Sequence, residues 1–325
     1  MLCVITGHCV NFWSGTWFTV LTQKYSSDIL STTSIWLSSF HTYGFTLVSG
    51  YLYYYLRNEK NKYSQFTPFI LTKAKRLLIP YCFCAIIWII PITATLYAYS
   101  VKDIFVKYIL CTSPSQLWFL WMLFWVFILA WSLSKLLKND VVAIIISILS
   151  WGSGLVGNMI LPNVFCIWTA FTYLPYFILG MKFREKKDWF LYKIPGGVYL
   201  VVQISFFILW QMLSSKAGTV AKILTLGLGY VVHIFGALAA FFVLQWLATK
   251  VNWKENKVFM FLSKRSMPIY LFHQQVIYFT IIWLNGKVNP YVNAAVNFVV
   301  AMVVSILISS VLMKFKWTRF LIGEK

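Results

Sequence analysis

Four histidines lie within long apolar stretches of this sequence, where an ionisable side chain is costly to place. They are His8, His41, His233 and His273. Imidazole titrates near neutral pH, so it can take up and release protons as a general acid or base. The alternative for each residue is a neutral imidazole that only bridges two helices. We expect this bridging role for His233, whose neighbours in GYVVHIFGALAA are small or apolar.

The other three histidines are expected at one depth in the molecule. If the surrounding segments are helical, Asn11 and Gly15 follow His8 at i+3 and i+7 and form a polar stripe with it. A helix rises about 1.5 Å per residue, which places His8, His41 and His273 at similar levels. We therefore expect the three imidazoles to converge on one cavity and to support acid–base chemistry.

Basic residues cluster in the segment SQFTPFILTKAKRLLIPY, which contains Lys73, Lys75 and Arg76. Lys73 and Arg76 are one helical turn apart, so both can face a single anion. Such a pair suits the phosphates of a nucleotide-like molecule. No glycine-rich phosphate loop occurs in the sequence, so side chains of this kind would have to hold a nucleotide. The alternative is an ordinary basic anchor at the membrane surface.

The segments that must position these residues are long apolar helices. The chain is 60 % hydrophobic and only 11 % charged, whereas soluble proteins contain about 25 % charged residues. Runs such as VVAMVVSILISSVLM do not alternate as the strands of a β-barrel do. The sequence therefore predicts an all-α, polytopic integral membrane protein. We expect ten spans, at 1–22, 33–56, 77–99, 117–134, 141–161, 164–181, 195–214, 223–249, 266–284 and 291–313.

Basic residues alternate between the two sides of these spans. The segments after the even-numbered spans and the C-terminal tail hold 22 of the 28 lysines and arginines. The positive-inside rule then places both termini in the cytoplasm. The net charge of +20 follows from this topology and from attraction to anionic membrane lipid, so we expect no nucleic-acid partner.

Acidic residues and cysteines narrow the function classes. All eight acidic residues fall in loops or tails, which argues against an ion-coupled transporter with carboxylates in its spans. The six cysteines lack the paired spacing of a metal site, so we expect no metal.

Five segments together resemble membrane acyltransferase family 3, in the order of that family. They are TGHC, SFHTYGFTLVSGYLYYY, KAKRLLIPY, SQLWFLWMLFW and LSKRSMPIYLFHQ. The resemblance implies one membrane domain over residues 1–325, in a bacterial cytoplasmic membrane. It implies an O-acyltransferase that moves acetyl or another acyl group from acyl-CoA to a hydroxyl of a capsular, exopolysaccharide or lipid-linked glycan. Acyl-CoA is then a donor substrate, and no permanently bound cofactor is expected.

The resemblance also implies roles for particular residues. His8 matches the essential histidine of the family's first helix and would act as general base or acyl carrier, with His41 orienting or relaying. The CoA phosphates would contact Lys73, Lys75 and Arg76. The expected substrate contacts are Asn11, Trp118 and His273, although an interfacial aromatic belt is the alternative for Trp118.

One feature departs from the family pattern. The family places a basic residue about three helical turns before the histidine of the first helix, whereas only seven residues, none of them basic, precede His8. Two explanations are open: sequence upstream of Met1 completes this helix, or Met1 is the native start and the basic partner of His8 is lost. Two alternative functions remain: a glycan flippase or exporter, and a non-catalytic membrane component of glycan assembly.

Overall fold

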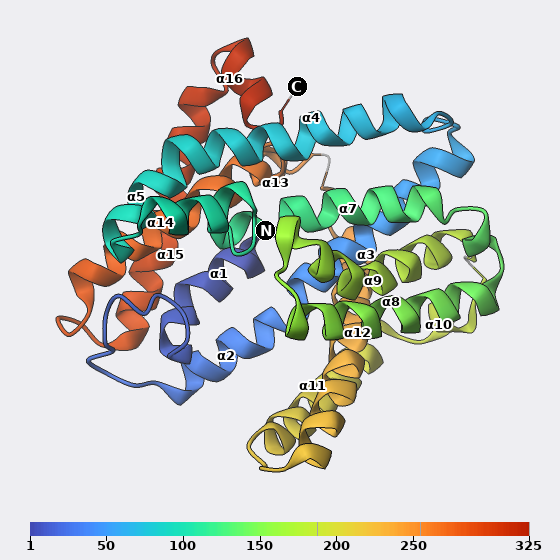
Figure 1. The fold of residues 1–325 in the computed structure, drawn as a ribbon, viewed down its shortest axis with the longest axis horizontal. Coiled ribbons are helices and arrows are strands. Elements are labelled where there is room, and N and C mark those ends of the chain that lie inside the picture. The colour runs from blue at the N-terminus through green and yellow to red at the C-terminus, as the bar shows by residue number, and fades with distance from the viewer. Residues whose placement is uncertain (187, 254, 325) are drawn as a thin grey trace.

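The computed structural model describes residues 1–186, 188–253 and 255–324, and no β-strand is formed within these ranges. Figure 1 shows the helical arrangement. The α-helices, in chain order, are α1 (Leu2–Val10), α2 (Asp28–Ser38), α3 (His41–Tyr54), α4 (Phe66–Cys84), α5 (Ile90–Tyr97), α6 (Val101–Ile104), α7 (Trp118–Ser132), α8 (Asp140–Ile160), α9 (Ile167–Glu185), α10 (Phe190–Lys193), α11 (Gly196–Ser214), α12 (Thr219–Lys250), α13 (Lys257–Ser263), α14 (Ser266–Leu284), α15 (Pro290–Leu312) and α16 (Lys316–Leu321).

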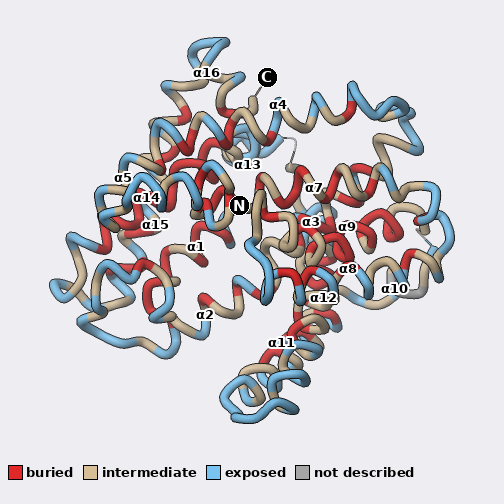
Figure 2. Tube along the Cα trace, in the orientation of Figure 1, coloured by how far each residue is buried: buried red, intermediate tan, exposed pale blue. Residues whose placement is uncertain are grey.

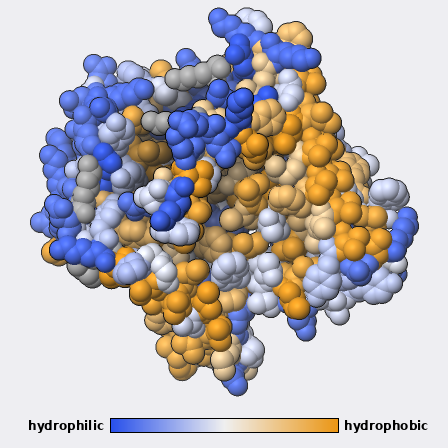
Figure 3. Space-filling model, turned by 180° about the vertical axis from the view of Figure 1, so that it is seen from behind, coloured by the Kyte–Doolittle hydropathy of each residue, from blue (hydrophilic) through white to orange (hydrophobic). Residues whose placement is uncertain are grey.

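Seven helices of the described residues are long and apolar enough to cross a membrane. They are Phe66–Tyr97, Ser115–Ser132, Asp140–Ile160, Val164–Glu185, Gly196–Ser214, Thr219–Lys250 and Pro290–Leu312. The all-α, polytopic membrane class is therefore confirmed. Figure 3 shows hydrophilic residues gathered along one edge of the molecule, with apolar residues over most of the remaining face. The count of ten spans and the placement of the termini stay predictions.

The first predicted span is not one long helix. Helix α1 ends at Val10 and continues only as a 3₁₀ segment, Asn11–Ser14. Gly15 then adopts φ +77°, a left-handed conformation that ends helices. The side-chain amide of Gln23 donates to the carbonyl of Phe12 at 2.6 Å and satisfies this helix end. The expected polar stripe beyond His8 on a continuous helix was therefore wrong.

The second predicted span is broken between α2 and α3. Phe40 adopts φ −137° and ψ −27°, outside helical geometry. Two histidine side chains take carbonyls near the break. His41 Nδ1 lies 2.6 Å from the carbonyl oxygen of Leu37, and His233 Nδ1 lies 2.9 Å from that of Ser39. These side-chain donors compensate for the backbone bonds that the break removes.

The third predicted span begins eleven residues earlier than expected, at Phe66, and runs through α4 and α5 to Tyr97. A π-helical turn, Ala85–Ile89, joins the two helices. Pro91 follows this turn and has no backbone N–H to donate. The helix continues through the wider π-helical turn instead of ending. As a result, the basic residues at 73–76 belong to the long helix itself.

Helices α3 and α9 cross with their backbones in contact. A Cβ atom at Gly50 would overlap the carbonyl of Phe177, and one at Gly180 would overlap the carbonyl of Leu47. Only glycine permits this approach, which is the usual device for close packing of membrane helices. Figure 2 shows many buried residues in this part of the molecule, whereas the outer end of the α11–α12 pair is exposed.

Candidate functional site

A cavity of ≈ 450 Å³ links residues that are far apart in the sequence. His8 of α1 and His41 of α3 line one part of it, and Lys73 and Arg76 of α4 line another. Other walls come from α7 and α14, and Glu324 of the C-terminal segment also contributes. The cavity therefore joins two imidazoles to two cations through one continuous space.

His8 and His273 are hydrogen-bonded to each other. Their Nδ1 and Nε2 atoms, respectively, are 2.6 Å apart. The ring centroids are 4.9 Å apart and the ring planes differ by 9°, so the two rings lie nearly in one plane rather than one above the other. This is the geometry of a direct N–H···N bond. The bond joins residues 265 positions apart in the sequence.

The partners of His273 determine which atom carries each proton. Nδ1 of His273 lies 3.0 Å from the carbonyl oxygen of Ile269 and 2.9 Å from that of Tyr270. A carbonyl oxygen only accepts, so Nδ1 of His273 must donate. In the neutral ring Nε2 then accepts, and Nδ1 of His8 is its donor. The Nε2 atom of His8 keeps its lone pair, and no other described residue hydrogen-bonds to it.

His41 has the same tautomer as His8, but a different acceptor fixes it. Its Nδ1 donates to the carbonyl of Leu37 across the break between α2 and α3. The Nε2 atom of the neutral ring therefore also keeps its lone pair, on a residue that lines the cavity. Two imidazoles with basic nitrogens free for a reaction thus share one space.

The indole of Trp17 packs beside the imidazole of His8. The indole of Trp17 lies nearly parallel to the imidazole, with centroids 5.9 Å apart and planes at 11°. Trp17 in turn contacts Tyr278 at 5.0 Å between centroids. The imidazole orientation is therefore set by one hydrogen bond and one ring contact.

Lys73 and Arg76 line the cavity from the same face of α4. The ammonium of Lys73 lies over the rings of Phe127, Tyr63 and Phe69, at 3.8, 5.0 and 5.5 Å from their centroids. Such contacts stabilise a cation without neutralising it. Among the described residues, no carboxylate lies within ion-pairing distance of Lys73 or Arg76.

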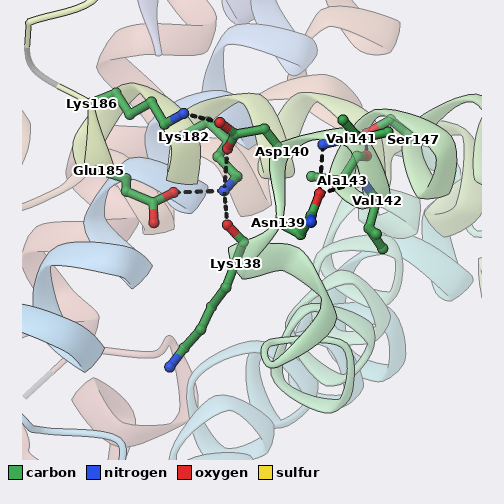
Figure 4. Close-up of polar contacts among 10 residues, drawn as sticks. All are labelled: Lys138, Asn139, Asp140, Val141, Val142, Ala143, Ser147, Lys182, Glu185 and Lys186. Carbon is green, nitrogen blue, oxygen red and sulfur yellow. Dashed lines mark hydrogen bonds and ion pairs between the residues drawn. The ribbon is translucent and has the colours of Figure 1, made fainter.

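A few basic residues elsewhere in the described part of the chain are, by contrast, paired with acidic ones. Figure 4 shows Lys182 between Asp140 and Glu185, at 2.9 and 2.7 Å, with Lys186 also paired to Asp140. Lys182 additionally donates to the carbonyl of Lys138 at 3.2 Å. Since these cations are already satisfied, they are unsuited to capture an anion, in contrast to Lys73 and Arg76.

The structure does not bring Lys75 into the cavity. Lys75 lies two residues from Lys73 on the helix and is exposed on a different face. There it lines a shallow apolar groove with Leu78, Cys82 and Leu321. Only Lys73 and Arg76 of the three predicted phosphate contacts therefore share the space with the histidines.

The predicted substrate contacts have different positions. Trp118 lines the cavity and packs against Tyr173, with ring centroids 5.5 Å apart. His273 reaches the site through its bond to His8. Asn11 instead accepts a hydrogen bond from the hydroxyl of Ser34 at 2.7 Å and joins the first 3₁₀ segment to α2.

Gln116, which no sequence motif singled out, lines the cavity and is buried. Its amide donates to the carbonyl of Leu271 at 3.0 Å and to Oε1 of Gln275 at 2.9 Å. The hydroxyl of Tyr270 donates to the carbonyl of Gln116. The available signal was the presence of side-chain amides in the apolar segments SQLWFLW and LFHQQV.

His233 lies outside the cavity lining, and its ring stacks on Tyr43 with centroids 4.1 Å apart. Its Nδ1 donates to the carbonyl of Ser39, so it bridges α12 to the break before α3.

Comparison with known proteins gives one match. Residues 1–314 match the family described as an acyltransferase domain, acyltransferase family 3. No curated protein and no solved structure matches the chain.

Proposed function

The chain belongs to acyltransferase family 3 and is a multi-pass membrane acyltransferase, and from this premise we propose its substrates and its reaction. The donor is acyl-CoA, with acetyl as the acyl group. The acceptor is a hydroxyl of a cell-surface or lipid-linked polysaccharide, and the membrane is the bacterial cytoplasmic membrane. The observation that carries this proposal is the single cavity shared by His8, His41, Lys73 and Arg76.

The cations are the proposed contacts of the donor. Lys73 and Arg76 are one turn apart and without a carboxylate partner among the described residues, so their charges are available to phosphate groups of CoA. Hydrogen bonds between an arginine and a phosphate are charge-assisted and directional. The thioester would then extend from these residues along the cavity toward the histidines.

His8 is the proposed base. Its Nε2 lone pair accepts the proton of the acceptor hydroxyl while the hydroxyl oxygen forms a bond to the acyl carbon. The carbon–sulfur bond of the thioester breaks, and the CoA thiolate takes the proton from His8. During this step Nδ1–H of His8 stays bonded to Nε2 of His273, which stabilises the transient imidazolium.

The same lone pair also suits the second possibility, in which Nε2 of His8 attacks the thioester and carries the acyl group before transferring it. An acyl-histidine trapped with donor alone supports the carrier, and its absence during active turnover supports the base. In both versions His41 lies in the same cavity, with its own Nε2 available to orient the acceptor.

The test uses membranes that contain the protein, prepared from a polysaccharide-producing host without its own O-acetyltransferase. Acetyl-CoA labelled in the acetyl group is added, and alkali-labile label in the glycan fraction is measured. The wild type and Lys75→Ala are expected to incorporate label, and His8→Ala is expected to lower the rate about 10²- to 10⁴-fold. Equal incorporation by His8→Ala contradicts the catalytic role. Glycan export without any ester label favours a flippase instead.

A further inference from the structure

Each of the two cavity histidines lies beside the end of a helix. His8 is two residues before the end of α1 at Val10, where α-helical geometry changes to 3₁₀. His41 is the first residue of α3, directly after the break at Phe40. Helix ends have fewer backbone hydrogen bonds than helix interiors, so something else must keep these two positions in place.

Asn297 of α15 makes hydrogen bonds to both helices that carry the His8–His273 pair. Its Nδ2 donates to the carbonyl of Cys9, the residue after His8, at 3.2 Å. Its Oδ1 accepts from the hydroxyl of Thr280 at 2.6 Å. Thr280 lies on α14, about two turns beyond His273. Asn297 is fully buried, so neither bond has water to replace it.

His233 of α12 has the corresponding position at the other break. It donates to the carbonyl of Ser39, two residues before His41. The Ser39 hydroxyl in turn accepts from Nε2 of Gln203 at 3.1 Å. Helix α12 lies directly on the break, because a Cβ at Gly236 would come within 2.7 Å of Cβ of Phe40.

We propose that Asn297 and His233 are positioning residues, each of which holds a helix end so that the neighbouring cavity histidine points its Nε2 atom into the cavity. The expected effect on kcat rests on the proposed function. The hydrogen bonds made by Asn297 and His233 do not depend on that function. Neither residue lines the cavity, so each acts through a neighbouring histidine. Asn297 acts through His8, and His233 acts through His41. Asn297 sets α1 against α14, and His233 sets the start of α3.

A simple role in stability predicts a different result from positioning. Loss of stability lowers the amount of folded protein and leaves the kinetic constants of the remaining molecules unchanged. Loss of positioning lowers kcat while the KM for acyl-CoA stays constant, since Lys73 and Arg76 lie on α4, which neither residue contacts by hydrogen bond. A displaced reacting group is expected to lower kcat about ten- to hundredfold.

The chain provides a matched control for Asn297. Asn293 lies one turn earlier on α15, is also buried, and has an Oδ1 atom without a hydrogen-bond partner among the described residues. Asn297→Leu is expected to lower kcat about tenfold or more with an unchanged KM, whereas Asn293→Leu leaves both within about twofold. Equal losses in the two variants overturn the proposal. If Asn297→Leu does not fold, Thr280→Val removes one of its two bonds and is judged by the same criterion.

His233 is tested by two substitutions that separate the ring from the donor. His233→Phe keeps an aromatic ring beside Tyr43 and removes the donor to Ser39. His233→Asn loses the ring and keeps an amide N–H near the position of Nδ1. We expect kcat to fall in His233→Phe and to recover at least in part in His233→Asn. Equal loss in both variants overturns the role of the hydrogen bond.

A spectroscopic measurement separates this proposal from the proposed function. The imidazole ¹⁵N resonances of His8 and His273 in the purified protein report the N–H···N bond whether or not any acyl group is transferred. We expect the coupling across this bond to be lost in Asn297→Leu and retained in Asn293→Leu. If the wild type transfers no acyl group but the coupling is still lost in Asn297→Leu, positioning is supported and the proposed function is contradicted. Retained coupling and unchanged kcat in an active protein contradict positioning alone.

Discussion

The two ends of the cavity are built differently. At the histidine end, His8 is held by His273, and His273 by two backbone carbonyls, so the ring positions and tautomers follow from fixed partners. At the basic end, the ammonium of Lys73 lies over aromatic rings and Arg76 is exposed. Under the proposed function, the histidine end is preorganised for the reaction, whereas the basic end has charge available for the donor, which is not part of the protein.

Because of this difference, we expect substitutions at the two ends of the cavity to change different kinetic constants. A preorganised group stabilises a transition state, so changes at the histidine end should lower kcat. A group that contacts the unreactive part of a substrate contributes to ground-state binding as well, so changes at the basic end should raise KM.

After the loss of His8 itself, the largest effect is expected from the loss of His273, which supports His8. His273→Phe removes the acceptor of the bond from Nδ1 of His8 and leaves its tautomer free. We expect kcat to fall about ten- to hundredfold, because a reacting group that is no longer held in its productive orientation loses rate on this order. The measurement is steady-state acetyl transfer. His273→Gln keeps an amide oxygen that can accept from His8 and should retain more activity; similar losses in both variants would show that the acceptor atom is not what matters.

A change at the basic end should affect the donor alone. Arg76→Ala removes a charged phosphate contact and is expected to raise the KM for acetyl-CoA about tenfold, with kcat nearly unchanged. Lys75→Ala, on the other face of α4, is the control. The KM for acetyl-pantetheine, which lacks the nucleotide phosphates, should be the same in wild type and Arg76→Ala. If the truncated donor is affected equally, Arg76 does not contact phosphate.

The smallest effect is expected from Glu324, which lines the cavity. Burial raises the pKa of the Glu324 carboxyl, and Arg76 partly offsets this rise. Its negative charge lies on the lining where an anionic donor would approach. Glu324→Gln is therefore expected to lower the KM for acetyl-CoA about two- to threefold, the effect of one screened charge.

The pH dependence of the KM for acetyl-CoA tests whether the charge of Glu324 causes this difference. As the pH falls through the raised pKa, the wild-type carboxyl becomes neutral and its KM should approach that of Glu324→Gln. The measurement is KM for both proteins across the acidic range. A difference in KM that persists when the carboxyl is protonated would exclude charge as its cause.

Much of the architecture was predictable because it depends on local composition. Apolar runs of about 20 residues indicate membrane helices wherever they pack, and most span boundaries after residue 115 lie within a few residues of those observed. The shared face of Lys73 and Arg76 follows from helical periodicity. The same periodicity places Lys75 on another face, so its exclusion from the cavity was also available from the sequence.

The breaks near the histidines were not predictable in this way. Residues 1–22 and 33–56 are apolar enough for continuous helices, and composition does not show where a helix changes direction. The ends depend on side chains from elsewhere, such as Gln23 bonded to the Phe12 carbonyl and His233 bonded to that of Ser39. The position of Asn11 against Ser34 depends on the same packing.

The sequence by itself therefore determined the membrane class, the inventory of ionisable residues in apolar segments and the resemblance to an acyltransferase family, because each is a property of local runs of residues. Only the tertiary structure decided that His8 bonds to His273, that their tautomers leave Nε2 of His8 unprotonated, and that one cavity joins them to Lys73 and Arg76. The physical reason is that hydrogen-bond partners 265 positions apart are brought together by the packing of whole helices, which no local pattern specifies.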